Sequence, residues 1–162
     1  MNLFKVALCS LTVSAAATVC RAQAEGTPKR ADAVRLGAIQ ARLFYESTGT
    51  FSENVLTERG FDLWNTPFDW TYATFVVVEV EGVPAYLARR RRIDLTARYV
   101  PLGRKRSVRL RQTEWIRNGS ESGKAYAGFW LRNTGCEPVY LTARLAGHRR
   151  PLRATIQFGC GE

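Results

Sequence analysis

The sequence predicts one all-β domain, built as a sandwich of two sheets with about seven strands. Three observations lead to this fold class. Apolar and polar side chains alternate with a period of two along most of the chain, as they do in a strand with one buried face. Clusters of Gly, Pro and Asn separate these segments and are typical of turns. Beyond the first 24 residues, no segment sustains the 3.6-residue period of an amphipathic helix.

The first two strands are expected in the first half of the chain. Apolar and polar residues alternate over 39–45. A helix over 31–43 is the alternative for this region, but Gly37 weakens it because glycine is a poor helix former. Residues 75–80 are a β-branched run, which is typical of a strand in the middle of a sheet.

The second half of the chain supplies the other five strands. They are expected at 92–99, 108–116, 125–131, 139–145 and 153–158. Turn signals separate the strands at 82–84, 101–103, 118–119 and 147–151. Seven short strands in a domain of this size are typical of immunoglobulin-like or fibronectin-like sandwiches. A small β-barrel is the alternative.

The first 24 residues have the three parts of a secretory signal peptide: a positive start, an apolar stretch, and a small-residue cleavage site at residues 22–24. We therefore expect cleavage before Glu25, an N-terminal extension over 25–37 and the sandwich over 38–162. The mature protein is expected to be exported, to the periplasm or the extracellular space.

Two observations argue against a membrane anchor. Cys20 could be a lipid-attachment residue, but Ala17 and Val19 fit poorly with the signal that precedes such a cysteine. The apolar stretch of the leader is shorter than the roughly 20 residues that cross a bilayer, and no later segment is long enough. The sequence predicts no transmembrane segment.

Cys136 and Cys160 are the only cysteines of the mature chain. If 139–145 and 153–158 form a hairpin centred on His148, Cys136 lies opposite Cys160 at disulfide distance. An oxidising compartment favours the bond. Closing a loop of about 25 residues would contribute roughly 3.5 kcal/mol to stability.

Positive charge is concentrated in the second half of the chain. Residues 25–81 carry a net charge of −4 and residues 82–162 a net charge of +12. Ten Lys and Arg residues lie within 89–111. The residues expected to bind an anion are Arg90, Arg92, Arg98, Arg104, Lys105, Arg106, Arg109 and Arg111.

Alternation would place the strand members of this cluster on one outer face of a hairpin. Arginine binds carboxylate and phosphate through two parallel hydrogen bonds. The partners expected for an exported protein are anionic lipid, acidic polysaccharide or an acidic protein, while nucleic acid is a poor candidate. The alternative is an ordinary solvated strand face.

A second candidate site is an aromatic-rich connection over 61–72. Its binding residues would be Trp64, Phe68, Trp70 and Tyr72. Exposed aromatic residues can stack on sugars or anchor a partner. The alternative is that this loop folds back and closes one end of the core.

Catalytic and cofactor motifs are absent from the sequence, so no enzyme activity and no cofactor or metal is predicted. The mature chain has one histidine, His148, in an expected turn. Glu79 and Glu81 project from one face of a strand and suggest an alternative function, a carbohydrate- or cell-wall-active enzyme. A structural subunit of a secreted assembly is the third alternative. The leading prediction is a small binding or envelope-associated protein.

Overall fold

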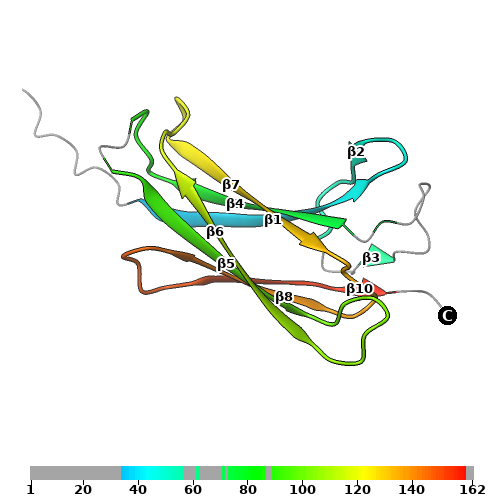
Figure 1. Cartoon of the computed structure of the whole chain (residues 1–162). Helices are drawn as coiled ribbons and strands as arrows, with labels where there is room; N and C mark the ends of the chain where they lie inside the picture. The colour runs from blue at the N-terminus through cyan, green and yellow to red at the C-terminus, as the bar shows by residue number, and fades with distance from the viewer. Residues whose placement is uncertain (1–33, 57–60, 63–70, 72, 87–88, 160–162) are drawn as a thin grey trace, which may run out of the picture.

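The described part of the protein is built mainly from antiparallel β-sheets. The computed structural model describes residues 34–56, 61–62, 71, 73–86 and 89–159. These residues form two four-stranded sheets and one short two-stranded pairing, and none of them is helical (Figure 1). The all-β prediction is confirmed, and the architecture is consistent with a sandwich. In the part of the chain that the structure describes, no helix is present that could cross a membrane.

The first sheet has the strand order β2-β1-β4-β7. Its strands are β1 (Arg35–Tyr45), β2 (Thr50–Phe51), β4 (Ala73–Glu81) and β7 (Lys124–Arg132). β4 pairs antiparallel with β1 on one side and with β7 on the other.

The second sheet has the order β6-β5-β8-β9. It is formed by β5 (Arg91–Tyr99), β6 (Val108–Ile116), β8 (Val139–Leu145) and β9 (Leu152–Ile156). The short parallel pairing joins β3 (Phe61–Asp62) and β10 (Phe158–Gly159).

The start of the domain is a strand and not the alternative helix. β1 begins at Arg35, inside the predicted N-terminal extension, and it pairs with β4 from that residue onward. The pairing shifts register between Leu36 and Ile39, where Gly37 lies. This irregularity interrupts the alternation that the sequence shows cleanly only from Ile39 onward.

The core lies between the inward faces of the two sheets. Alternate residues of β4, β5, β7 and β8 are buried in it, and Val76, Val78 and Val80 of β4 are fully buried. The largest fully buried side chains include Phe129 of β7 and Leu95 of β5. The hydroxyls of Thr74 and Thr134 are buried with this core and form a hydrogen bond of 2.9 Å, which satisfies both of them.

The β8–β9 hairpin corrects one prediction. Val139 lies opposite Ile156 and Ala143 opposite Leu152, so the hairpin is centred between Gly147 and His148 instead of on His148. The expected register was therefore wrong by one residue.

The register does not test the predicted disulfide, because the β8–β9 ladder ends at Ile156, before either cysteine is reached. Cys160 lies outside the described residues, so the Cys136–Cys160 bond stays a prediction. The predicted signal peptide lies outside the described residues as well.

Candidate functional site

Arginines gather on the outer face of the β6-β5-β8-β9 sheet. Arg98 of β5 lies directly opposite Arg109 of β6, and Thr96 lies opposite Arg111. Directly opposed residues of an antiparallel pair share one face of the sheet. Arg92 lies on this same face, because it is four residues before Thr96 in β5 and alternate residues of a strand share a face. Four of the eight predicted anion-binding residues are thus brought together on a solvent-exposed surface.

Two further arginines belong to this surface and were missed by the sequence analysis. Arg144 of β8 lies opposite Asp94, and Arg153 of β9 lies opposite Thr142. Both are exposed. Alternation in 139–145 places Arg144 on an outward face, but only the pairing of β8 with β5 shows that it is the same face. The set is called the arginine face and consists of Arg92, Arg98, Arg109, Arg111, Arg144 and Arg153.

The other predicted residues lie at the two ends of the arginine face. Arg90 comes just before β5, and residues 104–106 are in the connection between β5 and β6. All of them are exposed. The backbone of Arg104 is held in a turn, because its N–H donates to the carbonyl of Pro101 at 2.9 Å. These residues extend the positive charge beyond the strands without being part of the ladder.

Asp94 is the acidic centre of the arginine face. Its side chain is only 10% exposed, and its carboxylate lies 3.1 Å from Nη2 of Arg111 and 3.4 Å from Nε of Arg92. The hydroxyl of Thr113 donates a third contact at 2.7 Å.

The environment of Asp94 favours its charged form. Burial alone would raise the pKa of Asp94, but hydrogen bonds from Thr113 and Arg111 and the charges of Arg92 and Arg111 outweigh burial, so the pKa lies below its ordinary value. Asp94 therefore holds two guanidinium groups in place on the sheet surface.

Aromatic side chains accompany the arginines. The guanidinium carbon of Arg98 lies 5.3 Å from the ring centroid of Tyr140, within the range of a cation–π contact. Trp115 lies opposite Arg92 and is 54% exposed. The surface thus combines fixed positive charge with apolar rings.

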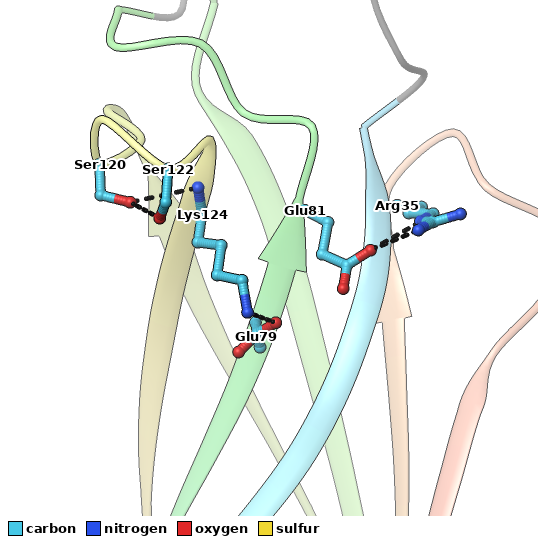
Figure 2. A network of polar contacts seen from close by, with 6 residues as sticks. All are labelled: Arg35, Glu79, Glu81, Ser120, Ser122 and Lys124. Atoms are coloured by element: carbon cyan, nitrogen blue, oxygen red, sulfur yellow. Dashed lines mark hydrogen bonds and ion pairs between the residues drawn. The ribbon is translucent and has the colours of Figure 1, made fainter.

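Glu79 and Glu81, the alternative catalytic pair, each contact a different cation (Figure 2). Oε1 of Glu79 lies 2.8 Å from Nζ of Lys124, and Oε2 of Glu81 lies 2.6 Å from Nη2 of Arg35. The hydrogen bond and charge of Glu79 raise the pKa of Lys124. Both carboxylates are used in ion pairs across the sheet.

Gly37 leaves space for these two carboxylates. A Cβ atom on Gly37 would lie 3.1 Å from Oε1 of Glu79 and 3.2 Å from Oε1 of Glu81. Glu81 also lines a cavity of about 620 Å³, together with Arg35 and His148. His148 is exposed in the β8–β9 turn, as predicted.

Two further sequence predictions concern metal binding and the aromatic-rich connection. Among the described residues, no three His, Cys, Asp or Glu side chains gather closely enough to hold a metal ion. The predicted aromatic-loop residues Trp64, Phe68, Trp70 and Tyr72 lie outside the described part of the chain.

No known protein family and no characterised protein sequence matches this chain. Its function is therefore argued from the arginine face and its surroundings.

Proposed function

We propose that this protein is an exported, envelope-associated binding protein that contacts an extended anionic ligand through the arginine face. The observation that carries the proposal is the strand register, which places Arg98 opposite Arg109 and adds Arg144 and Arg153 from two further strands.

Repulsion among these side chains supports an anionic partner. Like charges directly opposite each other destabilise a sheet, and Arg98 and Arg109 are such a pair. The only ion pairs that the described residues form on this face go to Asp94, from Arg92 and Arg111. An anion bound across the face offsets the remaining repulsion, because each guanidinium can donate two parallel hydrogen bonds to a carboxylate or phosphate.

The spread of the charge indicates the kind of ligand. The six arginines come from four adjacent strands, which are spaced roughly 4.8 Å apart. Arg90 and residues 104–106 continue the positive charge beyond both ends. An extended ligand with many negative groups fits this distribution better than a single small ion. Acidic polysaccharide, an anionic lipid surface and an acidic protein all meet that description.

The sandwich itself is proposed to be of the immunoglobulin or fibronectin kind. If the short β2 is left out, one sheet has three main strands, β1, β4 and β7, and the other has four, β6, β5, β8 and β9. In the constant-type immunoglobulin domain, the fourth strand pairs with the fifth. Here the fourth main strand, β6, pairs with β5 in the opposite sheet, an arrangement that favours the fibronectin-like variant.

An enzyme acting through Glu79 and Glu81 is less well supported. A general acid or base must be available to the substrate, whereas both carboxylates are engaged by Lys124 and Arg35. The arginine face has no comparable set of neutralising partners among the described residues.

The test compares two double variants with the same change in net charge. Arg98→Gln with Arg109→Gln removes two charges from the arginine face. Arg35→Gln with Arg42→Gln removes two exposed charges from β1, which belongs to the other sheet. Binding is measured on immobilised heparin, and on phosphatidylglycerol and phosphatidylcholine vesicles, over a series of salt concentrations.

The first variant is expected to elute from heparin, or to leave anionic vesicles, at clearly lower salt than the unmodified protein, because exposed charges are screened by salt. The second variant is expected to behave nearly as the unmodified protein does. The proposal would be overturned by an equal loss of binding in both variants. It would also be overturned if the unmodified protein bound neither heparin nor phosphatidylglycerol vesicles. The probe that binds distinguishes a polysaccharide from a lipid surface.

A further inference from the structure

A cluster of four aromatic rings lies on the outer face of the other sheet. Phe44 of β1 pairs with Phe51 of β2, and Phe75 of β4 pairs with Trp130 of β7. The centroids of Phe75 and Trp130 are 4.9 Å apart, and those of Phe44 and Trp130 are 5.5 Å apart in an edge-to-face arrangement. Phe51 is 43% exposed and Trp130 is 41% exposed. We call these four residues the outer aromatic cluster.

The position of the cluster is fixed by its neighbours. Gly128 lies in β7 opposite Val77, and a Cβ atom there would approach the Phe75 ring to 2.5 Å. The absence of a side chain therefore lets the Phe75 ring lie against β7, beside Trp130. The side chain of Gln112 in β6 donates to the backbone carbonyl of Trp130 at 2.6 Å. This hydrogen bond ties the edge strand β7 to β6 at Trp130.

A cavity of about 550 Å³ opens at one end of the outer aromatic cluster. Phe44 and Trp130 form its apolar walls, and Glu46, Arg132 and Asn133 contribute polar groups. Its volume is within the range of about 300–1,000 Å³ found for small-molecule sites. The Asn133 backbone has a φ of 55°, which is uncommon for a residue other than glycine.

Thr71 gives this cavity a rigid wall. Its hydroxyl donates to the carbonyl of Phe44 and accepts from the N–H of Ala73 at 3.2 Å.

Glu46 and Arg132 form no ion pair with each other, since none of the salt bridges among the described residues joins them. A carboxylate, a guanidinium and an amide are thus available at the edge of an aromatic surface.

We propose that this cavity binds one pyranose ring of a neutral saccharide, stacked on Trp130. A sugar ring has an apolar face of C–H groups, which packs on an aromatic ring, and an edge of hydroxyls. Those hydroxyls can donate to Glu46 and accept from Arg132 or Asn133. An acyl chain or an apolar side chain would bury the two charged groups without partners, which is costly. A free anion would be repelled by Glu46.

The proposal stands apart from the arginine face. The cavity is formed by residues of β1, β4 and β7 and by residues just beyond the ends of these strands, all from the sheet opposite to that face. The two sites can therefore be disabled separately.

The experiment measures binding of cellotriose and N,N′,N″-triacetylchitotriose, both neutral, to the whole protein by saturation-transfer NMR and calorimetry, with palmitate as the apolar probe. Trp130→Ala removes the stacking surface, and Glu46→Gln removes one charged acceptor. The matched control is Tyr126→Ala, which removes an aromatic side chain on the same face of β7 that is 55% exposed and does not line this cavity.

At least one of the trisaccharides is expected to bind, and Trp130→Ala to weaken its binding by about tenfold. Glu46→Gln should weaken it less, and Tyr126→Ala should leave it unchanged. The Trp130→Phe variant keeps a ring in place and should recover part of the affinity. If neither sugar binds at millimolar concentration, if palmitate binds instead, or if Tyr126→Ala weakens binding as much as Trp130→Ala does, the proposal is wrong.

Discussion

Asp94 is the residue on which the arginine face depends most directly. It is one of only five acidic residues in 82–162, and it is buried next to Arg92 and Arg111. A carboxylate in this position has two consequences. It neutralises part of the local repulsion, and it orients the two guanidinium groups, so that they lie in fixed positions when a ligand arrives.

We expect Asp94→Asn to lower the free energy of unfolding at pH 7 by about 1–3 kcal/mol, because the negative charge that strengthens the hydrogen bonds from Thr113 and Arg111 is lost and one acceptor oxygen becomes a donor. The pKa of Asp94 is depressed in the folded protein, so this stabilisation is full above the ordinary pKa of 3.8 and is lost as the pH falls through the lower folded value. Urea unfolding at pH 7 and at several values below 4 measures the difference.

The control for this prediction is Glu114→Gln, which removes one exposed acidic charge from β6. It should change stability little at any pH. A difference between Asp94→Asn and the unmodified protein that stays constant down to the lowest pH would contradict the expected linkage.

Seven of the ten strands among the described residues could be predicted from the sequence, because each is long enough to show alternation or, in β4, a β-branched run. The predicted segment 139–145 coincides with β8, and the predicted segment 108–116 coincides with β6. β2, β3 and β10 have two residues each, and two residues have no period. Their pairing is decided by contacts with distant strands.

Alternation also predicted the part of the candidate site that lies on one hairpin, but it could not predict the residues that other strands contribute. Alternation within 92–111 places Arg92, Arg98, Arg109 and Arg111 on one face, because the two strands of a hairpin are neighbours in sequence. Arg144 joins that face through the pairing of β8 with β5, which are 40 or more residues apart. The outer aromatic cluster was missed because its rings come from four separate strands.

The free edge of β1 is protected by side chains in the segment after β2. The Ser52 hydroxyl accepts from the N–H of Leu43 at 2.9 Å, and the Asn54 side-chain oxygen accepts from the N–H of Ala41 at 3.0 Å. In return, the N–H groups of Ser52 and Val55 donate to carbonyls of β1. Exposed strand edges promote aggregation, so these two side chains replace a missing neighbouring strand.

Replacing Ser52 and Asn54 with Ala is expected to lower the free energy of unfolding by about 1 kcal/mol for each lost hydrogen bond. Amide exchange of Ala41 and Leu43 should become faster, as measured by hydrogen–deuterium exchange NMR. Ser122→Ala, at a hydroxyl that contacts only the exposed Ser120, serves as the control. Unchanged exchange at both amides would show that these caps do not protect the edge.

The charge asymmetry of the sequence corresponds largely to the two sheets. The β6-β5-β8-β9 sheet comes entirely from the positively charged half of the chain, whereas β1, β2 and β4 come from the negatively charged half. β7 is the exception, since it crosses to the first sheet and brings Lys124 to Glu79.

The predicted disulfide would close the C-terminal part of this molecule. We expect purified mature protein to contain no free thiol, and reduction to lower its free energy of unfolding by roughly 3.5 kcal/mol, the value for a closed loop of about 25 residues. Thiol titration under denaturing conditions and urea unfolding with and without reductant measure both quantities. Two free thiols per chain would contradict this prediction.

Because the core separates the two sheets, the arginine face and the outer aromatic cluster point in opposite directions. A molecule seated on a negatively charged layer through its arginines would turn the proposed saccharide cavity toward whatever lies on the far side. If both proposed sites bind, the protein would be suited to joining two materials, and it could not enclose one ligand between the two sites.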